Sequence, residues 1–204
     1  MSTPLVQARR ANDYDAIVVG SGMTGGWAAK ELTQQGLRTL VLEAGRPITP
    51  ERDAVEHTAP FEMKFRGLGD RRTVEARQRT QRNSVSFDEM SHVFWTDDVD
   101  NPYSAPAGKP FEWFRARQVG GKSLIWGRQV YRMSDLDFEA NAREGIAVDW
   151  PIRYRDIAPW YDHVERFIGI SGKAEGIAHL PDSVFLKPMA MNVVEQHVQS
   201  RIAA

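Results

Sequence analysis

The sequence is free of cysteine, and this absence excludes disulfide bonds, thiolate metal sites and a cysteine nucleophile within these 204 residues. Long hydrophobic runs are absent too, since no apolar stretch approaches the ~20 residues that a helix needs to span a bilayer. The charges nearly cancel, because the sequence has 26 Lys and Arg and 27 Asp and Glu. The net charge of −1 indicates no polyanionic partner such as nucleic acid. Arg9-Arg10 precede no hydrophobic region, so we predict a disordered polar lead-in over residues 1–12 rather than an export signal.

The feature that stands out is a glycine-rich turn between two short apolar runs. Gly20-Ser21-Gly22-Met23-Thr24-Gly25 follows the run Ala16–Val19 and opens a stretch of helical character that ends at Gly36. A second apolar run, Thr39–Leu42, delivers Glu43 at its end. Strand, tight glycine turn, helix, strand and acidic residue follow one another in the order that a dinucleotide-binding βαβ unit requires.

Each position in this pattern has a physical role. Gly20 permits the tight turn, Gly22 lets the backbone approach a pyrophosphate, and Gly25 lets helix and sheet pack closely. The N–H groups from Ser21 to Gly25, at the positive end of the helix dipole, are expected to hold the pyrophosphate. Glu43 is expected to accept hydrogen bonds from ribose hydroxyls. We therefore predict an α/β fold with a Rossmann-like βαβ domain that binds FAD or NAD(P).

The predicted βαβ unit covers residues 13–50, and a long polar insertion, residues 51–115, follows it. An insertion of this length with little regular structure is often a lid or a subunit contact. It contains an arginine-rich stretch: Arg71, Arg72, Arg77, Arg79 and Arg82. This stretch is either a docking surface for an acidic partner or a solvated face, and we favour the second. Asp97, Asp98 and Asp100 lack the glycine and downstream glutamate of a calcium loop, so we predict a solvated turn there.

A second glycine-rich segment covers residues 116–145. It contains Val119-Gly120-Gly121-Lys122-Ser123-Leu124-Ile125-Trp126-Gly127, and its glycine pair lets the backbone come close to a flat or charged ligand. Farther on, Ser134 precedes Asp137 by the spacing of a capping box. This spacing predicts a helix that runs to about Arg143.

Two further helices are predicted in residues 146–204. The first carries an apolar stripe at helical spacing, which we interpret as core packing: Ile157, Trp160, Tyr161, Val164 and Ile168. His163 lies off this stripe and is expected to be exposed. The second helix is predicted from Val193 to Ile202.

Together these motifs resemble the N-terminal part of a glucose–methanol–choline (GMC) flavoprotein oxidoreductase. The resemblance rests on Val19–Gly25, Val41–Gly45 and Val119–Gly127, and it continues through Trp150-Pro151 and the helix over residues 156–168. Ile125-Trp126-Gly127 looks most like the branch that contains bacterial gluconate dehydrogenase flavoprotein subunits and pyranose oxidases. That branch oxidises sugars and sugar acids.

The resemblance implies FAD-dependent oxidation of a CH–OH group in an alcohol, sugar or sugar acid, with hydride transfer to flavin N5. It places the cofactor against three groups of residues: Gly20, Ser21, Gly22, Met23, Thr24 and Gly25; Glu43, Ala44 and Gly45; and Arg117, Val119, Gly120, Gly121, Ser123, Trp126 and Gly127. Arg117 is equally well interpreted as a surface arginine, and Trp126 also as a core aromatic residue.

Two departures from the family pattern bear on the cofactor. Many members have Asn where this chain has Trp126, which separates it from the main choline and methanol-oxidase line. Pyranose oxidases place a His, able to carry a covalent flavin bond, where this chain has Ile125. Because isoleucine has no nucleophile, we expect non-covalent FAD.

The catalytic His of the family, with its His or Asn partner, lies near the C-terminus of a much longer chain. None of the five histidines here matches that motif: His57, His92, His163, His179 and His197. We therefore predict no catalytic residue and no metal site, and interpret the chain as an N-terminal FAD-binding fragment. Residues 146–204 are then the incomplete start of the substrate half, and the unpaired sheet edges predict marginal solubility.

Two alternative functions stay open, an NAD-dependent dehydrogenase and a non-catalytic nucleotide-binding fragment. The NAD alternative leaves Val119–Gly127 unexplained. The resemblance also implies an alcohol or sugar substrate, with a small subunit and a cytochrome as candidate partners, while oxygen or a quinone remain alternative electron acceptors. The expected location is cytoplasmic, or periplasmic and membrane-associated through a partner subunit.

Overall fold

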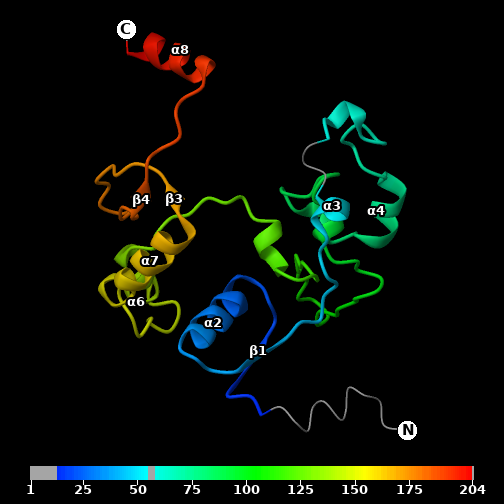
Figure 1. Cartoon of the computed structure of the whole chain (residues 1–204), viewed down its shortest axis with the longest axis horizontal. Coiled ribbons are helices and arrows are strands. Elements are labelled where there is room, and N and C mark those ends of the chain that lie inside the picture. The colour runs from blue at the N-terminus through cyan, green and yellow to red at the C-terminus, as the bar shows by residue number, and fades with distance from the viewer. Residues whose placement is uncertain (1–12, 55–57, 204) are drawn as a thin grey trace. The chain divides into compact units, whose positions relative to one another are not determined.

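The computed structural model describes residues 13–54 and 58–203, so the predicted lead-in and His57 lie outside the described residues. The chain divides into two compact units, Met1–Gly127 and Arg128–Ala204, and Figure 1 traces the chain through them. The division falls within residues 116–145, which the sequence analysis treats as one segment. In the described part of the chain, no helix combines the length and the apolar character needed to cross a membrane.

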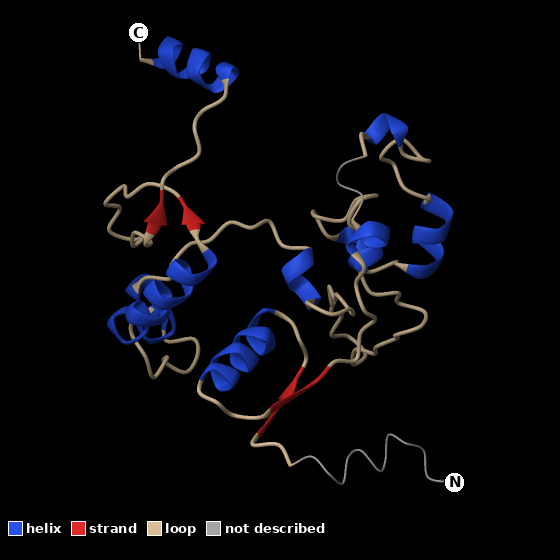
Figure 2. Cartoon of the chain, in the orientation of Figure 1, coloured by secondary structure: helices blue, strands red, loops and turns tan. Residues whose placement is uncertain are grey.

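The first unit opens with the strand–helix–strand order that the sequence predicts. β1 (Ala16–Val19) and β2 (Thr39–Leu42) pair in parallel and in register along their whole length. The helix α2 (Met23–Gln34) connects them, and Figure 2 shows it in blue beside the two red strands. Gly36 follows the helix with φ +84°, the left-handed conformation that suits glycine just past a helix end. These elements confirm the expected mixed helix and strand class.

The rest of the first unit, which includes the predicted insertion and the start of the second glycine-rich segment, consists of short helices joined by loops. Its helical elements are α3 (Pro50–Asp53), η1 (Pro60–Glu62), α4 (Arg71–Arg77), η2 (Gln81–Asn83), η3 (His92–Phe94) and η4 (Gly121–Leu124). The helix α4 begins where the Asp70 carboxylate accepts a hydrogen bond from the N–H of Thr73 (3.3 Å), an ordinary N-cap.

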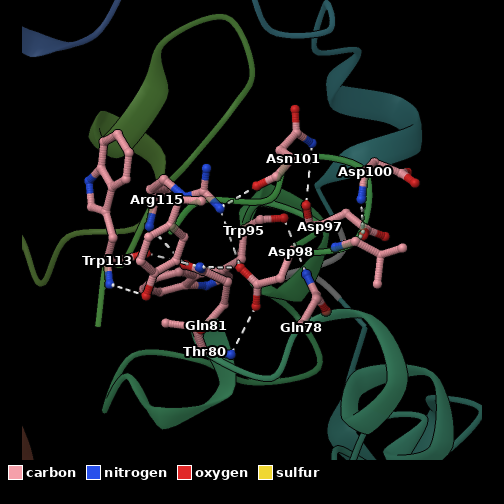
Figure 3. A network of polar contacts seen from close by, with 12 residues as sticks. Gln78, Thr80, Gln81, Trp95, Asp97, Asp98, Asp100, Asn101, Trp113 and Arg115 are labelled. Carbon is pink, nitrogen blue, oxygen red and sulfur yellow. Dashed lines mark hydrogen bonds and ion pairs between the residues drawn. The ribbon is translucent and has the colours of Figure 1, made fainter. Parts of the chain in front are cut away.

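A buried glutamine organises the insertion in place of a large apolar core (Figure 3). Gln81 is fully buried, and its Nε2 donates to Asp98 Oδ1 (2.8 Å) and to the carbonyl oxygen of Trp113 (3.0 Å). Its Oε1 accepts the backbone N–H of Arg115 (2.7 Å). These bonds join parts of the chain that lie 17 to 34 residues apart, so the segment is an internally bonded body.

The prediction of a solvated turn is wrong for two of the three aspartates. Arg77 pairs with both Asp97 and Asp100, and Asp98 lies 3.5 Å from the guanidinium of Arg115. The side chains of Asp97 and Asp98 are 26% and 15% exposed, whereas Asp100 is 64% exposed. Local composition did not reveal their basic partners, which are remote in the sequence. The favoured solvated face holds for the arginines that are exposed: Arg71, Arg72, Arg79 and Arg82.

The second unit is mainly helical. Its elements are α5 (Asp135–Phe138), α6 (Ala140–Glu144), α7 (Tyr154–Ile168), β3 (Ile170–Ser171), β4 (Phe185–Leu186) and α8 (Val193–Ile202). β3 and β4 pair in parallel. The capping box of Ser134 and Asp137 is confirmed. The helix predicted to about Arg143 is confirmed as far as Glu144 with one interruption, at Glu139 (φ −97°, ψ −5°), which separates α5 from α6.

A buried ion pair anchors the helix α7, while three residues of its apolar stripe, Ile157, Tyr161 and Val164, are half-buried. Trp160 and Ile168 are 65% and 48% exposed, so the prediction that the stripe forms a core is wrong for these described residues. Glu165 is the buried residue of the helix, and its carboxylate accepts two hydrogen bonds from Arg132, at 2.9 and 2.5 Å. His163 is exposed, as expected.

Candidate functional site

The glycine turn between β1 and α2 has the geometry that its glycines require. Gly20 has φ +89°, and a Cβ on Gly25 would lie 2.0 Å from the Gly20 carbonyl oxygen. The helix therefore lies directly on the turn, and a larger residue at 25 cannot fit without a shift. A Cβ on Gly22 would meet nothing within 4 Å, so the space beside this backbone is open. Gly22 begins α2, and no described side chain caps the helix, which leaves its positive end available to an anion.

The carboxylate of Glu43, at the end of β2, lies against the same turn. Its Oε2 accepts the hydroxyl of Ser21 (2.6 Å) and the backbone N–H of Ser21 (2.8 Å), and its Oε1 accepts the N–H of Gly45 (2.6 Å). The Ser21 hydroxyl is the main cause that lowers the pKa of Glu43 below its ordinary value. The backbone N–H groups of Ser21, Gly45 and Ala44 lower this pKa further, and an ionised carboxylate acts only as a hydrogen-bond acceptor.

The bond to Glu43 changes the expected role of the Ser21 backbone. We predicted that this N–H holds a pyrophosphate, but in the structure it donates to the carboxylate. The Ser21 N–H is therefore taken by Glu43, and pyrophosphate binding by the N–H groups from Gly22 to Gly25 stays a prediction.

The second glycine-rich segment meets the first turn directly. The N–H of Gly120 donates to the Ser21 hydroxyl oxygen (3.0 Å), across 99 residues of sequence. A Cβ on Gly121 would lie 3.3 Å from the Cα of Gly22. Gly120 and Gly121 have φ of +88° and +51°, a left-handed conformation that L side chains rarely adopt. The two glycine turns thus form one surface with bare backbone on both sides.

The same segment also contacts the end of β2. The N–H of Val119 donates to the carbonyl oxygen of Arg46 (2.9 Å). A Cβ on Gly45 would lie 2.3 Å from the backbone of Gln118, so glycine is required at this crossing. The glycine turn, Glu43 to Gly45, and the Gly120 turn are therefore assembled in one place, although they come from three distant parts of the sequence.

The remaining predicted residues are arranged less tightly. The Ser123 hydroxyl donates to the Gly120 carbonyl (2.7 Å) and stabilises the second turn. Ala44, Arg117, Trp126 and Gly127 are exposed, and no described contact draws the side chains of Arg117 and Trp126 to the glycine turns. Their proposed roles stay predictions. Ile125, next to Trp126, is buried and apolar.

The sequence analysis missed Gln118. This residue is 2% exposed, and its Nε2 donates to the carbonyl oxygen of Gly121 (3.1 Å), so it supports the second turn from inside. Its place directly before Val119-Gly120-Gly121 was the available signal, because a polar residue beside a glycine turn can satisfy the exposed carbonyls.

A hollow of about 440 Å³ opens beside the Gly45 crossing. Its lining includes Ala44, Gly45, Arg46, Arg117 and Gln118 from the site, with Val93, Trp95 and Thr96 from the insertion. His92 also lines the hollow, and burial lowers the pKa of its imidazole. Among the described residues, no cluster of His, Asp and Glu is arranged to hold a metal ion.

This arrangement offers what a dinucleotide needs. The backbone beside Gly22 is open, the start of α2 has no side-chain cap, and the Glu43 carboxylate lies against the same turn. The residues present therefore fit a dinucleotide cofactor with a pyrophosphate at the helix start and a ribose at the carboxylate.

Comparison with known proteins supports the same conclusion. No protein-family model matches the chain. Curated relatives include paromamine 6'-oxidase of Streptomyces fradiae, 29% identical over 80% of this chain, and the gluconate 2-dehydrogenase flavoprotein of Pantoea cypripedii, 26% identical over 82%. The fructose dehydrogenase large subunit of Gluconobacter japonicus is 24% identical over 78%. The chain spans about a quarter of the length of these relatives, 24–27%.

The names of these relatives are those of oxidases and dehydrogenases. The curated homologues of this chain are oxidoreductases of the glucose–methanol–choline family.

Proposed function

We propose that this chain is the Rossmann-like, FAD-binding part of an oxidoreductase that acts on a CH–OH group of an alcohol, sugar or sugar acid. The observation that carries the proposal is the assembly of both glycine turns around Ser21, with Glu43 on one side and Gly120 on the other. A glycine turn and an acidic residue fit any dinucleotide. The second glycine turn gives a second stretch of bare backbone, which favours the larger, flatter flavin, and the homologues support the same choice.

The roles of this chain's residues follow from their geometry. The N–H groups from Gly22 to Gly25 hold the pyrophosphate, and Glu43 accepts a ribose hydroxyl. Gly120 and Gly121 allow close approach of the isoalloxazine ring, since neither has a side chain. FAD, when bound, supplies the hydride acceptor. The buried isoleucine at position 125 has no nucleophile, so the flavin is held without a covalent bond.

The reaction needs groups that this chain does not supply. None of the described histidines lies in a matching catalytic motif, so we place the base that removes the hydroxyl proton outside this chain. One relative is named as a large subunit, which supports a partner subunit and a separate electron acceptor, such as a cytochrome, for the complete protein. A periplasmic or membrane-associated location through such a partner fits the same proposal.

The proposal can be tested with two glycines of the same turn. In Gly22→Val, the side chain enters the open space beside the backbone, and the extended conformation there (φ −65°, ψ −172°) accepts valine. In the matched control Gly26→Ala, the new Cβ lies 3.6 Å from the nearest atom, an ordinary contact.

We expect FAD to bind the wild-type chain and Gly26→Ala with similar affinity, and Gly22→Val at least about tenfold more weakly, which corresponds to a loss of about 1.4 kcal/mol. The measurement is quenching of flavin fluorescence in a titration, with NAD as competitor. Equal affinity in Gly22→Val, or displacement of FAD by NAD, would contradict the proposal.

A further inference from the structure

The hydroxyl of Ser21 occupies an unusual position, between the two halves of the site. Its oxygen lies 2.6 Å from Oε2 of Glu43 and 3.0 Å from the backbone nitrogen of Gly120. A hydroxyl has one proton and two acceptor positions. Because Glu43 is an acceptor and the Gly120 N–H is a donor, the direction of the chain is fixed: Gly120 donates to Ser21, and Ser21 donates to Glu43.

Ser21 also binds Glu43 a second time through its backbone N–H (2.8 Å). Both bonds reach the same oxygen, Oε2, whereas Oε1 takes the N–H of Gly45 (2.6 Å). The carboxylate is therefore fixed by the turn itself. A hydrogen bond to an ionised group is about twice as strong as a neutral one, so these three bonds hold the carboxylate firmly against the turn.

The consequence reaches the second turn. Gly120 has φ +88°, and its neighbour Gly121 lies against Gly22. If the hydroxyl is removed, the N–H of Gly120 loses its acceptor and the Glu43 carboxylate loses one of its two shortest hydrogen bonds (2.6 Å). One small side chain then controls two parts of the site that are 77 residues apart, at positions 43 and 120.

We propose that Ser21 is a positioning residue that couples the Glu43 carboxylate to the Gly120–Gly121 turn, so that the ribose side and the flavin side of the site form together. This inference rests on the proposed function. It goes beyond that function because it gives the side chain of Ser21 a structural role, and this role requires no contact between Ser21 and the cofactor.

The first test needs no cofactor. The side-chain carboxyl of Glu43 and the amide of Gly120 are followed by NMR in the ligand-free chain, in the wild type, in Ser21→Ala and in Ser21→Thr, which keeps a hydroxyl. In Ser21→Ala we expect the pKa of Glu43 to rise, because the main cause of its lowering is removed. We also expect amide exchange at Gly120 to accelerate at least about tenfold, and Ser21→Thr to restore both signals toward wild type.

The second test measures coupling in FAD affinity with Ser21→Ala, Glu43→Gln and the double variant. We expect Ser21→Ala to weaken binding about tenfold in the wild-type background and much less beside Glu43→Gln, because the carboxylate that it orients is gone. Thr33→Ala is the matched control: this hydroxyl, on α2, bonds only its own helix backbone, and its loss should leave both signals and affinity unchanged.

The outcomes separate the two proposals. An unchanged Glu43 pKa and unchanged Gly120 exchange in Ser21→Ala overturn the coupling, even if FAD binds well. Additive losses in the double variant overturn it too. If the variants show the expected NMR changes but the wild-type chain binds no FAD, the coupling is supported and the proposed cofactor is refuted.

Discussion

Two adjacent glycines on α2 should respond to the same substitution with opposite sign. Gly25 and Gly26 both lie in the first turns of the helix, and alanine improves helix propensity by about 0.8–1 kcal/mol at an interior position. At Gly26 the new Cβ lies 3.6 Å from the Ser21 carbonyl oxygen, an ordinary contact. Gly26→Ala should therefore stabilise the first unit by up to about 1 kcal/mol.

At Gly25 the same substitution creates a steric clash with the backbone. The new Cβ would lie 2.0 Å from the Gly20 carbonyl oxygen and 3.0 Å from its carbon, and both atoms are backbone. The helix must move away from the turn by about 1 Å, and overpacking of this kind costs typically about 1–3 kcal/mol. Subtracting the propensity gain leaves Gly25→Ala about 0–2 kcal/mol less stable than wild type, and the two variants differ by roughly 1–3 kcal/mol.

The measurement is hydrogen exchange of peptides that cover β1 and α2, followed by mass spectrometry. This readout is local, because a chain of two units need not unfold in one step. We expect faster exchange in Gly25→Ala and equal or slower exchange in Gly26→Ala. Equal protection in the two variants would refute the close packing of α2 on the Gly20 turn.

Three further predictions concern other parts of the chain. Glu165→Gln leaves Arg132 without its buried partner and should destabilise the second unit by about 2–4 kcal/mol, measured by urea unfolding that is followed through exchange of the α7 peptide. The exposed control Arg166→Gln should cost at most about 0.5 kcal/mol, and equal losses in the two variants would contradict a buried pair. Thr96→Val removes a buried hydroxyl that has no hydrogen-bond partner, so thermal unfolding should show unchanged or slightly raised stability, and a loss above about 1 kcal/mol would reveal a partner. Because the folded-state pKa of Glu43 is lowered, its contribution is complete above the unfolded pKa and disappears as pH falls through the folded value. The protection factor of the β2 peptide, which corrects for the slower intrinsic exchange at low pH, should therefore fall on acidification below about pH 4.5, and less so in Glu43→Gln.

The parts of the fold that the sequence predicted correctly depend on near neighbours. The bounds of β1, α2 and β2 and the role of Gly36 follow from apolar runs and glycine positions within a few residues. The cap at Ser134 was found for the same reason, since its partner is three residues away.

The parts that the sequence did not predict depend on remote partners. Asp97 and Asp98 look solvated in the sequence because Arg77 and Arg115, which pair with them, are about 20 residues away on either side. The apolar stripe of α7 has helical spacing, but spacing alone does not show whether other residues cover the stripe. In the structure, the buried residue of this helix is Glu165.

The sequence predicted which residues form the candidate site, but it did not predict the hydrogen bonds that hold them together. Glycine spacing identified both turns, because each glycine in such a turn has its own structural requirement that only glycine meets. The bond from the Ser21 hydroxyl to Glu43, and the support that Gln118 gives to the second turn, could not be read from spacing, since each joins backbone and side chains whose orientation only the fold defines.

The most direct test of the account is an absorbance spectrum of the purified chain, recorded with and without added FAD and again after acid precipitation. We predict flavin bands that appear with FAD and stay in the supernatant after precipitation, because the Ile125 position offers no nucleophile for a covalent bond. Failure to take up FAD, with NAD bound in its place, would contradict the central claim, and colour retained in the pellet would contradict the non-covalent attachment.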